Sequence, residues 1–193
     1  MSSQCLTFTG RHVDPLNLQA SDVDIRDIAA ALSKMCRFNG HVRDFYSIGQ
    51  HSVLVSEQAV LLAVKGLGTA VSIRTAALFG LLHDASEAYI ADIIQPVKHT
   101  VEFTEYRQIE ARIQAAVCER FVIPLDNPFP AACVKRADEI LLAAEFRDLV
   151  PHADAAWAAQ CTQVSRIRPL LPERAELLFL RRFTELTEAR HAA

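Results

Sequence analysis

His83 and Asp84 stand together at the end of an apolar run over residues 75–82, where a charged pair is unexpected. Burying an unpaired charge is costly, so the pair needs compensation. A metal ion supplies it economically, because imidazole and carboxylate groups are both metal ligands. Two more polar residues, His51 and Asp138, fall on otherwise apolar helical stripes and are candidates to complete such a site.

Helical spacing groups several polar residues on one face. On a helix expected over roughly 71–88, residues three and four apart are neighbours, and one face then carries Gly80, His83, Asp84 and Glu87. Two carboxylates beside an imidazole repel each other unless a cation lies among them. Two imidazoles and two carboxylates suit Zn, Mn, Fe, Co or Ni better than Ca or Mg.

From the sequence alone, these polar residues also have simpler explanations than a metal site. A single inward histidine is more often a hydrogen-bonded core residue than a ligand. Asp138 has Arg136 and Arg147 as candidate partners on its own helix. A histidine followed by an aspartate also arises often by chance, so the argument for a metal depends on several inward polar residues in one small helical chain.

The elements that must position these residues are nearly all helices. Gly and Pro are sparse and lie mainly between periodic segments. Residues 6–19 alternate apolar and polar around Gly10, which predicts a short hairpin or an extended arm. The stretch 124–130 is a loop by composition. Helices are predicted from Asp22 or Asp24, over roughly 49–65, 71–88, 104–120, 131–149 and 153–160, and after Pro172.

The composition narrows the class of protein. A chain of 193 residues is long enough for one domain with a sizeable core. Its net charge of −3 gives no electrostatic reason to bind a nucleic-acid polymer, and its apolar runs are too short to span a bilayer. The N-terminus lacks the pattern of a signal peptide, and five scattered cysteines suit reduced thiols. We therefore expect a cytoplasmic protein that binds neither nucleic-acid polymers nor membranes.

The order His51, His83-Asp84, Asp138 resembles that of the HD-domain metal-dependent phosphohydrolases. The segment 82–98 resembles more specifically the signature of the bacterial 5′-deoxynucleotidase branch and its phage-encoded dNTP triphosphohydrolase relatives. Three shorter segments also resemble this branch: Arg37-Phe38, 46–53 and 135–139.

The resemblance implies an all-α, HD-domain helical bundle with a short N-terminal hairpin or extended arm. We expect a single phosphohydrolase domain over 1–193, with a core at about 24–150 and C-terminal helices over 153–190. A homodimer is a further option, for which the apolar C-terminal helix is a candidate interface.

The resemblance also implies a metal site. It makes His51, His83, Asp84 and Asp138 the ligands of a divalent transition metal, which is Mn, Co, Zn, Fe or Ni. A second divalent ion such as Mg is compatible with the acidic residues nearby. A divalent ion lowers the pKa of bound water and polarises a phosphoryl oxygen.

Four other residues receive roles from the resemblance. Glu87 and Asp92 match the acidic pair beside the metal, as a proton donor or as ligands of a second ion. Arg37 matches an arginine that grips the substrate phosphate through its planar fork. Lys98, near the end of the same signature, is a second candidate phosphate contact.

This chain departs from the pattern of the branch at two positions. Phe38 stands where these nucleotidases commonly have Trp, which makes it a candidate determinant of selectivity for sugar or base. Gln50 stands where a Glu often precedes the first histidine, which alters hydrogen bonding around that ligand.

The expected activity is hydrolysis of a nucleotide, with removal of phosphate from a (deoxy)nucleoside 5′-monophosphate as the leading version. A dNTP triphosphohydrolase that releases triphosphate and an alarmone pyrophosphohydrolase use the same constellation. A non-catalytic nucleotide sensor or interaction module on the same fold is the alternative from another class. The retention of all four ligand positions favours an enzyme.

Overall fold

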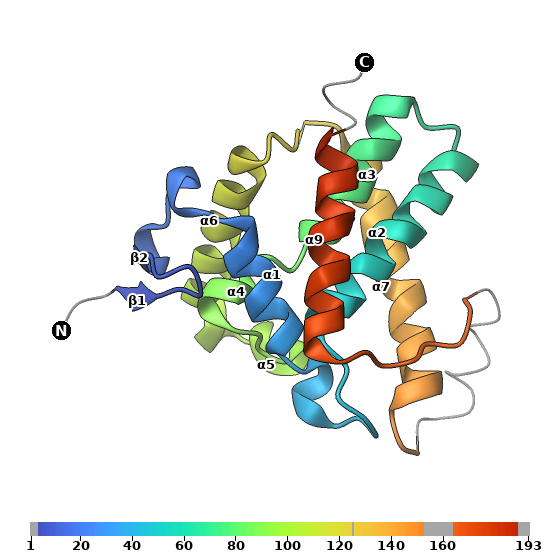
Figure 1. Cartoon of the computed structure of the whole chain (residues 1–193), viewed down its shortest axis with the longest axis horizontal. Coiled ribbons are helices and arrows are strands. Elements are labelled where there is room, and N and C mark those ends of the chain that lie inside the picture. The colour runs from blue at the N-terminus through green and yellow to red at the C-terminus, as the bar shows by residue number, and fades with distance from the viewer. Residues whose placement is uncertain (1–3, 125, 153–163, 189–193) are drawn as a thin grey trace.

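A computed structural model of the chain describes residues 4–124, 126–152 and 164–188 (Figure 1). The regular secondary structure of this part of the chain is helical apart from one small hairpin, so the predicted all-α fold with an N-terminal hairpin is confirmed. Its α-helices are α1 (Ile25–Lys34), α2 (Ile48–Lys65), α3 (Ala70–Leu82), α4 (Glu87–Ile90), α5 (Gln95–Lys98), α6 (Thr104–Arg120), α7 (Pro128–Leu149) and α9 (Pro172–Glu188). None of the helices in these ranges combines the length and apolar character that crossing a membrane requires.

The hairpin pairs β1 (Cys5–Leu6) with β2 (His12–Val13) in antiparallel register. Its turn is fastened to α1, because the backbone N–H and the hydroxyl of Thr9 both donate to the Asp27 carboxylate, at 2.7 and 3.0 Å. Asp27 is buried. The acceptors of a buried carboxylate are thus satisfied by the hairpin that covers it.

Short polar side chains fix where the long helices begin. An N-cap side chain accepts a backbone N–H of the first turn, which leaves one fewer donor without a partner. Four helices start in this way, at Asp24, Ser47, Thr69 and Asn127. The first of these is one of the two predicted starts.

Two predicted helix boundaries were wrong. The helix expected over 71–88 ends at Leu82, and a turn separates it from α4. The helix expected over 131–149 begins at Pro128, so the end of the predicted loop 124–130 is helical. Proline suits the first turn of a helix, where its missing N–H costs nothing. The predicted helix 153–160, and with it part of the predicted C-terminal helices 153–190, lies outside the described residues.

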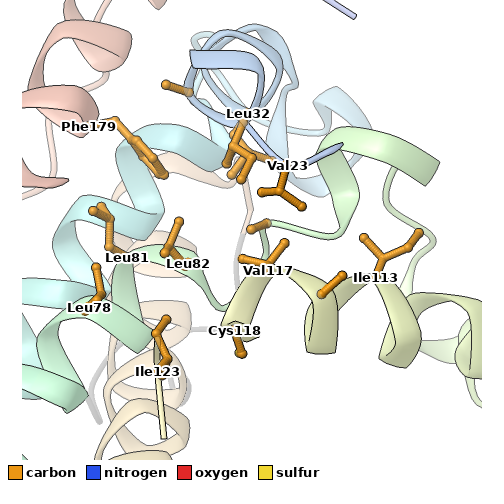
Figure 2. Close-up of a cluster of buried hydrophobic side chains, with 14 of the residues drawn as sticks. Val23, Leu32, Leu78, Leu81, Leu82, Ile113, Val117, Cys118, Ile123 and Phe179 are labelled. Carbon is orange, nitrogen blue, oxygen red and sulfur yellow. The ribbon is translucent and has the colours of Figure 1, made fainter. Parts of the chain in front are cut away.

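Among the long helices, α2 packs against α1, α3, α7 and α9, whereas α6 packs against α4 and α5 (Figure 1). On one side α2 packs against α3 and α7, and on the other α9 lies across α1, α2 and α3. One apolar core joins α1, α3, α6 and α9, with side chains that include Leu32, Leu81, Leu82, Val117 and Phe179 (Figure 2). A second core fills the space between α2, α3 and α7. Both cores hold α2 and α3 in fixed relative positions.

Residues 164–171, which we call the C-terminal strap, lead into α9 and run beside the start of α2. The Gln50 side chain holds the strap at two points: it donates to the carbonyl of Arg168 at 2.8 Å and accepts from the N–H of Leu170 at 2.9 Å. Asp148 of α7 accepts from the N–H of Ile167 at 2.8 Å. The strap is therefore fastened to both α2 and α7.

Candidate metal centre and substrate cavity

The four predicted metal ligands come together from three parts of the chain. His51 lies in the first turn of α2, Asp138 in the middle of α7, and His83 and Asp84 in the turn after α3. The His51 Nε2 atom lies 3.2 Å from Asp138 Oδ1 and 3.8 Å from Asp84 Oδ2. The His83 Nε2 atom lies 3.2 Å from the same Asp84 oxygen.

The turn that carries His83 and Asp84 is stabilised by side chains. Its backbone bonds Ala85 N–H to Leu82 O and Glu87 N–H to Asp84 O span three residues instead of four, which tightens the chain. Gln114 of α6 donates to the carbonyl of Leu82 at 2.8 Å. Glu87 therefore enters the site from α4, and the single helical face expected to hold it with His83 and Asp84 does not exist.

Hydrogen bonds fix which nitrogen of each imidazole ring carries the hydrogen. His51 Nδ1 lies 2.6 Å from Glu145 Oε1, and His83 Nδ1 lies 2.8 Å from the carbonyl of Gly80. A carbonyl only accepts, so His83 Nδ1 carries a hydrogen and its Nε2 keeps the lone pair when the ring is neutral. The Glu145 carboxylate is likewise an acceptor, so His51 Nδ1 also carries a hydrogen. Metal-ligating histidines characteristically donate their other ring N–H in this way.

These donors fit a divalent ion. His51 Nε2 is buried and makes no hydrogen bond of good geometry within the described part of the chain, although Asp138 Oδ1 lies 3.2 Å from it, so it is a candidate ligand atom. Donors about 2.1 Å from one ion lie roughly 3–3.5 Å from each other. One atom each of His51, His83 and Asp138 all lie within 4.8 Å of one another, a spacing that small side-chain movements bring to this range.

The electrostatics of the centre call for positive charge. Burial and Arg37 lower the pKa of His51, but Glu145 and Asp138 outweigh them and raise it to about 9. Burial acts to raise the pKa of Asp138, but His51 outweighs it and holds the pKa below its usual range. A cation among these carboxylates, whether a proton or a metal ion, is therefore stabilised.

Arg37 contacts two carboxylates of this centre, those of Glu145 and Asp84. It lies in the 3-10 turn η3 (Arg37–Gly40) after α1. Its guanidinium contacts Glu145 Oε2 at 3.2 Å and Asp84 Oδ2 at 3.6 Å. Burial lowers the pKa of Arg37, but the two carboxylates outweigh it and hold the pKa above its usual range. Arg37 is thus a permanent positive charge beside the candidate metal ligands.

A cavity of about 390 Å³ opens beside this centre. Its polar wall holds Arg37, Asp84, Glu87, Asp92, Gln95 and Asp138, and its apolar wall holds Phe38, Ile93, Ile94, Pro96, Leu142 and Phe146. The rings of Phe38 and Phe146 meet edge to face, with centroids 5.3 Å apart. One compartment thus combines charged groups with an aromatic surface, as sites for small ligands commonly do.

Phe38 holds an unusual backbone conformation. Its φ is 56°, in the left-handed region, and that of Asn39 is 50°. A bulky residue is strained there, and the Arg37 guanidinium lies 5.4 Å from its ring centroid. The predicted selectivity residue is therefore held in the cavity wall by its contacts with Arg37 and Phe146.

Glu87 and Asp92 line the cavity next to Asp84. Burial raises the pKa of Glu87 to about 10, with Asp84 and Asp92 adding to the effect and Lys98 opposing it. Between the two acids, Ala91 adopts φ 62° and ψ 168°, which is essentially a glycine conformation. The Tyr106 hydroxyl donates to the carbonyl of Ala91 at 2.6 Å and anchors this strained link to α6.

Lys98 is not among the residues that line the cavity. Its ammonium group lies 2.5 Å from Glu110 Oε1 and 4.0 Å from Asp92 Oδ1, and the residue is buried. Lys98 thus contacts the acidic side of the site through Asp92. Its predicted contact with phosphate stays a prediction.

Two residues of the site, Glu145 and Tyr46, received no role from the sequence. Glu145 is fully buried, contacts both His51 and Arg37, and accepts from the Tyr46 hydroxyl at 2.9 Å. A signal was available, because Glu145 follows Asp138 by seven residues and so lies on the same stripe of α7. Tyr46, which precedes α2, begins the segment 46–53 that resembles the branch, but the sequence predicted no role for it.

Known proteins are similar to this chain over much of its length. A family model described as 5′-deoxynucleotidase YfbR-like matches residues 30–163. The uncharacterized protein YfdR of Escherichia coli K12 is 35% identical over 191 residues, which cover 97% of each chain. An uncharacterized protein of Rhodobacter capsulatus is 35% identical over 151 residues, which cover 77% of this chain and 74% of the relative.

Proposed function

The chain belongs to the YfbR-like 5′-deoxynucleotidase family, and on this premise we propose that it is a metal-dependent phosphohydrolase of nucleotides. The family points to a nucleotide phosphohydrolase in general. The finer proposal is removal of phosphate from a (deoxy)nucleoside 5′-monophosphate. One observation carries it: two imidazole lone pairs and two carboxylates converge beside a cavity that also presents Arg37 and an aromatic wall.

The proposed ligands are His51, His83, Asp84 and Asp138. A divalent ion bound there supplies a water of lowered pKa and a charge that polarises a phosphoryl oxygen. Small side-chain movements suffice, because the carboxylate of Glu145 and the carbonyl of Gly80 already hold the two Nδ1 atoms, and both Nε2 atoms lie beside ligand carboxylates. Mn, Co, Zn, Fe and Ni all suit this mixed set of ligands.

The remaining polar groups act on the phosphate and on the leaving oxygen. Arg37 lines the cavity and offers its guanidinium to the phosphate, where a fixed charge stabilises the transition state. Glu87 is the proposed proton donor to the leaving oxygen, because it is buried in the cavity wall with a raised pKa. Asp92 also lines the cavity, and its Oδ1 atom lies 4.0 Å from the Lys98 ammonium group.

The apolar wall is the proposed place for the nucleoside. Phe38 and Phe146 offer ring faces and edges to a base or sugar, and such aromatic contacts stabilise bound rings. Phe38 lies directly beside Arg37 in sequence, so a phosphate held by Arg37 brings the attached sugar next to the Phe38 ring. This arrangement supports Phe38 as a determinant of substrate selectivity.

Metal analysis of the purified protein, followed by a nucleotide panel with identification of products, tests the proposal. We expect a bound transition metal and inorganic phosphate from a nucleoside monophosphate. Triphosphate released from a dNTP would instead indicate a dNTP triphosphohydrolase. Pyrophosphate released from an alarmone would indicate an alarmone pyrophosphohydrolase. Nucleotide binding by metal-loaded protein with no product would indicate a sensor.

A pair of variants tests the two acids. Glu87→Gln removes the proposed proton donor, and Asp92→Asn removes a charge from the neighbouring acid. If Glu87 gives up the proton, its variant should lose kcat by about 10²-fold or more, while substrates with better leaving groups lose less. Equal sensitivity of both variants to the leaving group would refute this assignment.

A further inference from the structure

Glu145 is a buried carboxylate that does not line the cavity but contacts the His51 ring and the Arg37 guanidinium. We infer that Glu145 is a positioning residue that fixes both the metal ligand His51 and the phosphate-binding Arg37. One carboxylate then sets the affinity for metal and the affinity for phosphate together. The inference deepens the proposed function and rests on it for the roles of His51 and Arg37.

The two oxygens of Glu145 divide the contacts between them. Oε1 accepts from His51 Nδ1 at 2.6 Å and from the Tyr46 hydroxyl at 2.9 Å. Oε2 faces the Arg37 guanidinium at 3.2 Å. Tyr46 is itself fully buried, so the carboxylate is held from a third side. The His51 ring and the guanidinium therefore take their positions from one rigid group.

To hold both His51 and Arg37, Glu145 needs its negative charge as well as its shape. A buried carboxylate is tolerated only with compensating partners, and here three donating groups face it: His51, Tyr46 and Arg37. A glutamine at this position has one oxygen and one NH2 group. Whichever way the amide turns, it presents donors to one of two groups that are themselves donors, His51 Nδ1–H or the guanidinium of Arg37.

Arg37 carries the effect back to the metal centre. Its other guanidinium nitrogen lies 3.6 Å from Asp84 Oδ2, an oxygen of a proposed ligand. Loss of the Glu145 charge therefore affects His51 directly and Asp84 through Arg37. His51 lies in α2 and Asp84 in the turn after α3, so loss of this one charge affects ligands from two elements of the same site.

The chain offers a matched control. Glu139 lies on the same helix, is exposed, and pairs with Arg136 at 3.0 Å. Glu145→Gln and Glu139→Gln make the same chemical change inside and outside the network. Tyr46→Phe removes one donor from Glu145 and leaves the contacts with His51 and Arg37 intact.

The experiment measures binding without any nucleotide. Co²⁺ is titrated into metal-free protein, its visible absorption spectrum is recorded, and inorganic phosphate is then titrated into the loaded protein. Glu145→Gln should weaken Co²⁺ binding by about tenfold or more, change the spectrum and weaken phosphate binding. Tyr46→Phe should have a smaller effect on both affinities, and Glu139→Gln should match the wild type.

Wild-type affinities and spectrum in folded Glu145→Gln would overturn the inference and leave the proposed function intact. A wild-type chain that binds no transition metal would refute the proposed function, and the inference with it. If Glu145→Gln does not fold, nitrogen-15 NMR of zinc-loaded wild-type protein decides. His51 must then show a proton on Nδ1, hydrogen-bonded to a carboxylate, and absence of that proton would overturn the inference.

Discussion

Gly80 of α3 and Ser56 of α2 bring the backbones of the two helices into direct contact. A methyl group added at Gly80 would lie 3.1 Å from the Cα atom of Ser56 and 3.2 Å from its nitrogen. The carbonyl of Gly80 also accepts the hydrogen bond from His83. This close approach therefore helps to set how far His83 lies from His51, five residues before Ser56.

Gly80→Ala should push α2 and α3 apart. Overpacking costs about 1–3 kcal/mol, and the better helix propensity of alanine returns about 1 kcal/mol. We expect a net loss of about 1 kcal/mol in the free energy of unfolding, measured by urea denaturation, and weaker metal binding. Val71→Ile, which adds a methylene at an exposed position of the same helix, should change neither. Unchanged metal affinity in Gly80→Ala would contradict this role.

Ala91→Gly should stabilise the protein. Alanine in this backbone conformation costs about 1–3 kcal/mol, whereas glycine costs about 0.5–1 kcal/mol in the entropy of the unfolded chain. We expect a net gain of about 1 kcal/mol by thermal or urea unfolding. Ala88→Gly, in the helical part of the same segment, should instead lose about 1 kcal/mol. A destabilised Ala91→Gly would show that the residue is not strained.

Lys98→Met should leave Glu110 without its partner. A hydrogen bond to a charged group contributes about 1.5–3 kcal/mol, so we expect the free energy of unfolding to fall by about 2 kcal/mol. Glu110→Gln should cost less, because its amide still offers Lys98 an oxygen. Phosphate titration of both variants then tests the predicted phosphate contact. Binding weakened tenfold in Lys98→Met alone would assign Lys98 to the phosphate.

Removal of the metal should lower the melting temperature. A ligand that binds only the folded state adds about 2.7 kcal/mol of stability at a hundred times its Kd. A chelator should therefore destabilise the wild type, and added Mn²⁺ or Co²⁺ should restore it. Asp84→Ala removes a proposed ligand, so chelation should leave its melting temperature unchanged and the variant should not hydrolyse nucleotides. An active, metal-loaded Asp84→Ala would refute the proposed site.

The sequence predicted the helices well because apolar spacing and caps are local signals. Asp24 as an N-cap and the helix over 104–120 are examples. The turn at 83–86 escaped prediction because it is held by contacts that are distant in sequence, such as the one from Gln114 to Leu82. Local helix propensity continues through this turn, and tertiary hydrogen bonds override it.

The same distinction applies to the site. Polar residues on apolar stripes marked His51 and Asp138 from the sequence, and the structure brings them together. Glu145 carries a similar signal, but its importance depends on which groups face it, and Arg37 and Tyr46 come from segments about a hundred residues away. The position of Lys98 likewise depends on its contact with Glu110 of α6. No local sequence pattern predicts that contact.

The strap held by Gln50 has a consequence for how the protein is made. Gln50 immediately precedes His51, and both of its side-chain bonds go to residues that follow it by 118 and 120 positions, Arg168 and Leu170. During synthesis the N-terminal residues leave the ribosome first, so His51 emerges long before the segment that fastens its neighbour. The hydrogen bonds around this histidine are therefore complete only after residues 168–170 have been synthesised.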